Sequence, residues 1–178
     1  MTAVSKAVAF LRRIGLGVDV VESVPVGSFM PMVAIRGGRL LVMPACPVSD
    51  LLHEAGHLAC VPARFRPWMD GNLAIGQRRM FRALEASGIE PDAPLMRAAI
   101  QCSDPEATAW AWAAGKHLGF AEADIIRDQD YEGEGRHIRK CLALGAYFGI
   151  NGLMAAGMCD HPRRGGYPLM VKWVQDAS

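Results

Sequence analysis

The sequence has almost no charge imbalance, no paired cysteines and few histidines. Among 178 residues, 19 lysines and arginines nearly balance 18 aspartates and glutamates. A formal net charge of +1 gives no general attraction to nucleic acid or to an anionic membrane. The five cysteines are odd in number and none stands in a Cys-x-x-Cys pair, which argues against a disulfide framework and a cysteine-based zinc knot. We therefore expect reduced thiols and a cytoplasmic protein.

Long apolar runs are also scarce. Near the beginning of the sequence, Lys6, Arg12 and Arg13 interrupt any stretch that could serve as a signal peptide. One uncharged run, residues 141–159, is long enough for a membrane helix. Because it contains four glycines and an asparagine, we expect two buried segments instead, with a helix ending at Gly149 or at Asn151-Gly152. A membrane-associated protein remains the alternative.

What is present is enough to form a core, since 51% of the residues are hydrophobic. We expect one domain over residues 1–178. Helical spacing predicts a first helix over 4–14, and β-branched residues predict a strand over 18–24. Apolar runs at 32–35 and 39–43 flank Gly37-Gly38 and predict a hairpin. Helices are expected over 48–60, 72–87, 95–102 and 105–118. The fold class is therefore predicted to be α+β, a small N-terminal β-sheet packed on a mainly helical domain.

Two of the five histidines stand four residues apart in His53-Glu54-Ala55-Gly56-His57, which fits His-Glu-x-x-His. On a helix, residues i and i+4 lie on the same face, so both imidazoles can reach one metal ion. Glu54 lies beside the first ligand, where a carboxylate can take a proton from an activated water. The surrounding leucines and alanines predict a buried helix. Because two histidines and a glutamate are costly to bury unpaired, a metal is favoured over structural histidines.

This motif, following a small hairpin, resembles the zincin metallopeptidases. The order of elements resembles the compact gluzincin-like group that includes the ImmA/IrrE peptidases. The resemblance implies a zinc-dependent peptidase that cleaves amide bonds through a metal-activated water, with His53 and His57 as zinc ligands and Glu54 as the catalytic base. It also implies a peptide or protein substrate bound along an edge strand, which here would be Arg39–Met43. The alternative is an inactive zincin-fold binding protein that still holds metal.

The resemblance requires a third ligand from a later element, and we predict Glu106. Gluzincin-like families place a glutamate on such a helix, and the alanines after Glu106 would allow close packing. The competing interpretation is structural, because Ser103-Asp104-Pro105-Glu106 also fits a helix capping box. Further candidates for the third ligand are Asp104, His117, His137 and His161.

The transition state of such a reaction needs a hydrogen-bond donor opposite the metal. Five side chains of suitable type lie in the second half of the sequence, and the residue pattern does not distinguish among them. They are Tyr131, His137, Tyr147, His161 and Tyr167.

Overall fold

The computed structural model describes residues 2–177 and begins with helix α1 (Ala3–Arg13). The Thr2 side chain accepts a hydrogen bond from the Ser5 backbone N–H at 3.1 Å and caps the helix. The apolar face of α1 is buried and packs against helix α2 (Val48–Cys60). This arrangement confirms the first helix that the apolar spacing predicted.

A three-stranded sheet follows, formed by β1 (Val18–Val20), β2 (Val33–Arg36) and β3 (Arg39–Val42). Strands β2 and β3 form the expected antiparallel hairpin, while β1 pairs in parallel with β3. Strand β1 is shorter than predicted. The order β1-β3-β2 places β3 at the centre of the sheet. The predicted edge strand Arg39–Met43 is therefore wrong, because both sides of β3 are already paired.

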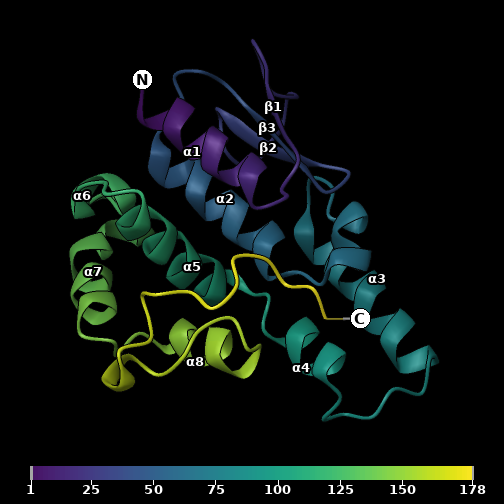
Figure 1. The fold of residues 1–178 in the computed structure, drawn as a ribbon. Coiled ribbons are helices and arrows are strands. Elements are labelled where there is room, and N and C mark those ends of the chain that lie inside the picture. Colours follow the sequence, from purple (N-terminus) through teal and green to yellow (C-terminus); the bar gives the residue numbers. More distant parts are fainter. Residues whose placement is uncertain (1, 178) are drawn as a thin grey trace.

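The rest of the described chain is mainly helical, and its order along the sequence can be followed in Figure 1. After α2 come η1 (Ala63–Trp68), α3 (Leu73–Ala86), α4 (Pro94–Ile100), α5 (Asp104–His117), α6 (Glu122–Ile125), η2 (Tyr131–Gly133), α7 (Gly135–Ala143), α8 (Phe148–Ala155) and η3 (Pro162–Arg164). A small sheet and a mainly helical remainder confirm the α+β class.

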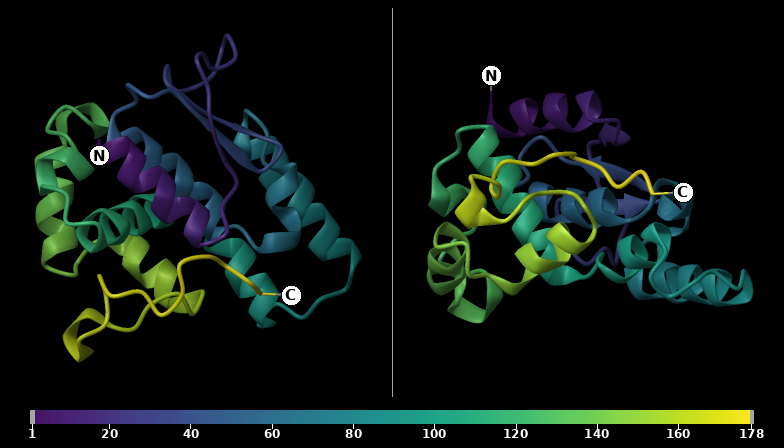
Figure 2. Two further views of the ribbon diagram at one scale, coloured as in Figure 1. Left: turned by 45° about the horizontal axis from the view of Figure 1, so that its top comes forward. Right: turned by 60° about the horizontal axis from the view of Figure 1, so that its bottom comes forward.

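Helices α2 and α5 form the centre of the core. A Cβ atom on Gly56 would lie 2.5 Å from the Ala107 carbonyl oxygen, so only glycine allows these backbones to approach so closely. Figure 2 shows α1 and α8 on opposite sides of this pair. The C-terminal segment crosses both helices, since Gln175 N–H donates to Ala59 O at 2.8 Å and Trp110 Nε1–H donates to Trp173 O at 2.8 Å. The C-terminal segment thereby contacts both central helices.

The uncharged run at 141–159 divides into two helices, but not where the sequence predicted. Helix α7 ends at Ala143 and α8 begins at Phe148, so Gly149 and Asn151 lie inside a helix. A Cβ at Gly149 would lie 2.0 Å from Pro105 O, which means that this glycine serves close packing against α5. Gly145, at φ 67°, is the residue that interrupts the helices. Within residues 2–177, every helix is too short or too polar to cross a lipid bilayer.

Candidate metal centre

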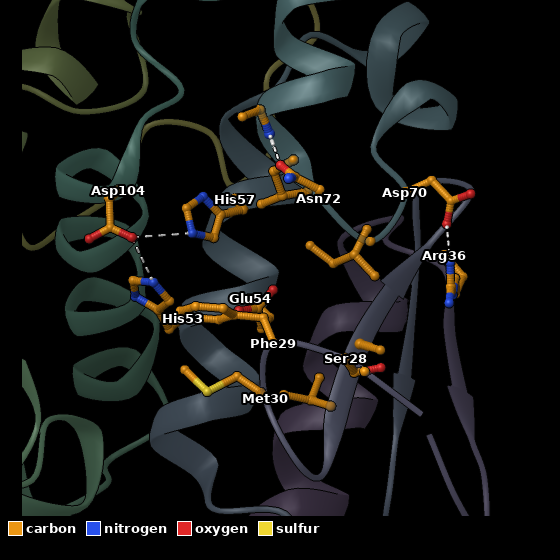
Figure 3. A pocket seen from close by; sticks show the side chains of 17 residues that line it. Ser28, Phe29, Met30, Arg36, His53, Glu54, His57, Asp70, Asn72 and Asp104 are labelled. Carbon is orange, nitrogen blue, oxygen red and sulfur yellow. Dashed lines mark hydrogen bonds and ion pairs between the residues drawn. The ribbon is translucent and has the colours of Figure 1, made fainter. Parts of the chain in front are cut away.

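His53 and His57 lie one turn apart on α2, and their rings face the N-terminus of α5 (Figure 3). The two ring centroids are 4.9 Å apart and the rings are nearly perpendicular. Asp104, the first residue of α5, points between them. Its Oδ1 atom lies 3.2 Å from His53 Nε2 and 3.5 Å from His57 Nε2. The two histidines share a face because they are four residues apart on one helix. Asp104 joins them because α5 packs against α2.

One ligand atom from each of these three residues lies within 4.8 Å of the others, so the group could hold a metal ion. Both histidine side chains are nearly buried, at 14% and 12% exposed, whereas Asp104 is 64% exposed. A carboxylate oxygen and two unprotonated imidazole nitrogens are all lone-pair donors, and here they converge on one point. Such a group is satisfied by a cation, either a proton on the histidines or a metal among all three.

The close approach of these three side chains shifts the pKa values of Asp104 and His53. Hydrogen bonding to His53 and His57 holds the pKa of Asp104 well below its usual range. Burial alone would lower the pKa of His53, but hydrogen bonding to Asp104 and the charges of nearby carboxylates outweigh burial and raise it. His57 Nδ1 is buried and has no hydrogen-bond partner among the described residues. On the Nδ1 side, the orientation of the His57 ring is therefore set by packing and not by a hydrogen bond.

Glu54 faces the cavity beside the two histidines (Figure 3). Its side chain is nearly buried, and its carboxylate makes no side-chain hydrogen bond within residues 2–177. Burial raises the pKa of Glu54, while the neighbouring His57 and His53 oppose that rise. Glu54 is therefore a buried carboxylate beside a group of side chains that could hold a metal ion.

The structure does not bring Glu106, the predicted third ligand, to the histidines. Its carboxylate accepts hydrogen bonds from the Ser103 backbone N–H at 3.1 Å and from the Ser103 hydroxyl. This is the capping box that the sequence offered as the competing interpretation, and the structure confirms it. Asp104, the next candidate, occupies the position that was expected for Glu106.

The remaining candidate ligands lie elsewhere in the described chain. The His117 ring packs against Phe10 and Trp173, with centroids 5.4 and 5.1 Å away. His137 Nε2 lies 3.5 Å from the Cys141 thiol, and His161 Nδ1 accepts from the Arg163 backbone N–H at 3.1 Å. The only group of metal-binding side chains found within residues 2–177 is therefore His53, His57 and Asp104.

Two of the tyrosines proposed as transition-state donors are committed to other contacts. Tyr167 donates its hydroxyl to Ala109 O at 2.8 Å and is buried. The Tyr131 hydroxyl lies 3.2 Å from His53 Nδ1, on the side of the ring that faces away from Asp104. Tyr131 thus contacts His53 at the ring nitrogen that points away from Asp104. The sequence did not indicate this contact.

A cavity of about 670 Å³ opens in front of the cluster. Its walls come from strand β2, from residues 27–30 and from residues 70–74, and none of these segments was predicted to belong to the site. Apolar side chains among them are Phe29, Met30, Val33, Ile35 and Leu73. The cavity therefore combines an apolar wall with a polar end formed by Glu54 and the three clustered residues.

Comparisons of this chain with protein-family models, with curated proteins and with solved structures found no match.

Proposed function

We propose that this protein is a metal-dependent hydrolase, specifically a zinc peptidase of the zincin type. The observation that carries the proposal is the convergence of His53 Nε2, His57 Nε2 and Asp104 Oδ1 at one end of a large cavity. Catalytic zinc sites typically have three protein ligands and an open position, and imidazole with carboxylate is a ligand set that suits zinc. The exposure of Asp104 toward solvent supports an open position.

When bound, a Zn²⁺ ion supplies Lewis acidity that activates a water and polarises a carbonyl group. His53 and His57 would hold it from α2, and Asp104 from α5. The role of Glu54 is to accept the proton of the attacking water and to return it to the leaving amine. Burial favours this role, because a carboxylate whose pKa is raised is a stronger base than an ordinary glutamate.

Strand β2 supports a peptide as the substrate. Met43 N–H donates to Met32 O at 2.9 Å, and hydrogen-bonded residues alternate along an antiparallel pair, so Val33 and Ile35 direct their backbone groups away from β3. Gly71 N–H already occupies the Ile35 carbonyl at 2.9 Å. The Val33 N–H and C=O and the Ile35 N–H have no other backbone partner within the described chain.

These free groups lie on a strand that lines the cavity, so an extended peptide could add to the edge of β2 and pass the metal cluster. We therefore propose that the substrate pairs with β2, the strand at the edge of the sheet, and not with β3. The bond from Gly71 limits the free edge to a short segment and indicates that only a few substrate residues pair with it.

The test is to measure bound metal by elemental analysis and to measure hydrolysis of a peptide library. We expect about one equivalent of zinc in the wild type and in Glu54→Gln, and much less in His53→Ala. Hydrolysis should fall by about 10²- to 10⁴-fold in Glu54→Gln, because the base is lost while the ligands remain. Glu90→Gln, at an exposed glutamate, is the matched control and should behave as wild type.

Failure of the wild type to retain any divalent metal would contradict the metal centre. Full activity of Glu54→Gln would contradict the role of Glu54. Zinc binding together with no hydrolysis of any library peptide would favour the alternative of a zincin-fold binding protein.

A further inference from the structure

Behind the metal cluster, the Tyr131 hydroxyl connects His53 to helix α5. It lies 3.2 Å from His53 Nδ1 and 2.9 Å from Thr108 Oγ1. Thr108 stands one turn after Asp104 on α5, and its hydroxyl lies 2.9 Å from the Asp104 carbonyl oxygen. A chain of polar groups therefore leads from the outer nitrogen of one histidine to the backbone of the residue that carries the third candidate ligand.

One direction of donation forms all three of these hydrogen bonds at once. A carbonyl oxygen can only accept, so the Thr108 hydroxyl donates its hydrogen to Asp104 O. Thr108 Oγ1 must then accept from the Tyr131 hydroxyl, which leaves the Tyr131 oxygen as an acceptor for His53 Nδ1–H. This arrangement places a proton on His53 Nδ1. In the absence of metal a second proton on Nε2 is donated to Asp104 Oδ1, and loss of that proton would leave the Nε2 lone pair facing the cluster.

The backbone that presents Tyr131 adopts an unfavourable conformation. Tyr131 and Glu132 are consecutive non-glycine residues with φ values of 57° and 60°. Left-handed conformations are strained for such residues, and strain of this kind persists where the surroundings enforce it. The position of the Tyr131 side chain is thus imposed by its neighbours.

Arg127 supplies much of that constraint. Its backbone N–H and Nε–H donate to the Asp130 carboxylate at 2.7 and 3.0 Å, next to Tyr131. Its Nη2 donates to Asp50 Oδ1 at 2.6 Å, one turn before His53 on α2. The same guanidinium therefore binds the segment that carries Tyr131 to the helix that carries His53.

We propose that Tyr131 is a positioning residue that holds His53 in the tautomer and ring orientation needed to bind metal through Nε2. The inference rests on the proposed metal centre and assigns Tyr131 a role distinct from that of a transition-state donor. Its hydroxyl hydrogen is committed to Thr108, so it has none to offer to a substrate oxygen. Partners of this kind on the outer nitrogen of a ligating histidine typically change metal affinity by about 10- to 100-fold.

The first experiment measures the Zn²⁺ affinity of the full chain by competition with a chromophoric chelator. Tyr131→Phe keeps the ring and removes the acceptor, and we expect it to weaken zinc binding by about 10- to 100-fold. The matched control is Tyr167→Phe, which removes a tyrosine hydroxyl bonded to the same helix α5 but remote from His53. It should change zinc affinity by less than about twofold.

Thr108 tests the direction of donation. Thr108→Val removes the acceptor for the Tyr131 hydroxyl, so tyrosine can donate to His53 Nδ1 and disfavour the metal-binding tautomer. We expect a loss of zinc affinity smaller than that of Tyr131→Phe, and Thr108→Ser should restore it. Unfolding of the metal-free variants, measured alongside, separates this effect from a general loss of stability.

The second readout is the His53 Nδ1–H proton observed by NMR. A slowly exchanging signal is expected in the zinc-bound protein and in the metal-free protein, where Asp104 accepts from Nε2 and Tyr131 accepts from Nδ1. Tyr131→Phe should lose the signal in both states, and Tyr167→Phe should keep it. The inference is overturned if Tyr131→Phe retains both the signal and wild-type zinc affinity. Should the wild type bind no zinc, the metal centre fails, and the signal in the metal-free protein still decides the role of Tyr131.

Discussion

Two faces of helix α5 each carry a carboxylate, and the two carboxylates have different surroundings. Asp104 and Glu106 both carry carboxylates and stand two residues apart, so they project from nearly opposite sides of the helix. Asp104 faces α2, is 64% exposed and lies beside two histidines. Glu106 faces α8, is 6% exposed and accepts from Ser103, with a Gly152 Cβ position only 2.1 Å from its Oε1.

This difference explains why the Asp104 carboxylate, and not that of Glu106, is available to a metal ion if one binds. The hydrogen bonds of Glu106 come from its own helix cap, which the local sequence determines, and the packing of α8 encloses it. Among the described residues, the polar partners of the Asp104 carboxylate are His53 and His57, which are themselves potential ligands. We infer that the α2 face of α5 serves the site and that the α8 face serves stability.

The largest expected effect comes from matched amide substitutions at these two positions. Asp104→Asn should weaken zinc binding by more than about 100-fold, because a direct ligand contributes more than an outer partner. Glu106→Gln should leave zinc affinity within about twofold, since glutamine also forms a capping box. Chelator competition measures both. The reverse result would restore Glu106 as the third ligand and contradict the division of α5 into two faces.

Much of the fold could be predicted because local patterns determine it. The hairpin followed from two apolar runs around Gly37-Gly38, and helix α2 followed from apolar residues bounded by prolines. The pairing of His53 with His57 needed only the helical repeat. Each of these features depends on residues close together in the sequence.

The errors concern long-range packing. Whether Asp104 or Glu106 meets α2 depends on the rotation of α5, which the contact between Gly56 and Ala107 helps to set. Strand β3 became central because β1 pairs with it from a distance of some twenty residues in the sequence. Gly149 permits close packing inside α8 instead of ending a helix. In each case the sequence identifies the residue but not the distant segment against which it packs or pairs.

Glycine substitutions on the two sides of α5 give the next largest effect. Gly56→Ala would place a Cβ 2.5 Å from Ala107 O, and Gly152→Ala would place one 2.1 Å from Glu106 Oε1. Overpacking of this kind typically costs about 1–3 kcal/mol, so urea unfolding should show a loss of about 2 kcal/mol in each variant. Only Gly56→Ala should also weaken zinc binding, because it separates Asp104 from the histidines. Equal loss of zinc affinity in both variants would show that the two sides are coupled.

The smallest effect concerns the cap alone, measured by urea unfolding in the presence of a chelator so that metal plays no part. Glu106→Ala removes half of the capping box and should cost about 1 kcal/mol of unfolding free energy. Glu106→Gln should stay within about 0.5 kcal/mol of wild type, because the amide oxygen can replace the carboxylate. Asp104→Ala should cost less than about 1 kcal/mol, since the Asp104 side chain is 64% exposed and its interaction with the two nearly buried histidines is partly screened by water. If Asp104→Ala instead destabilised the metal-free protein more than Glu106→Ala, Asp104 would be a structural residue, and the α2 face of α5 would contribute to stability as the α8 face does.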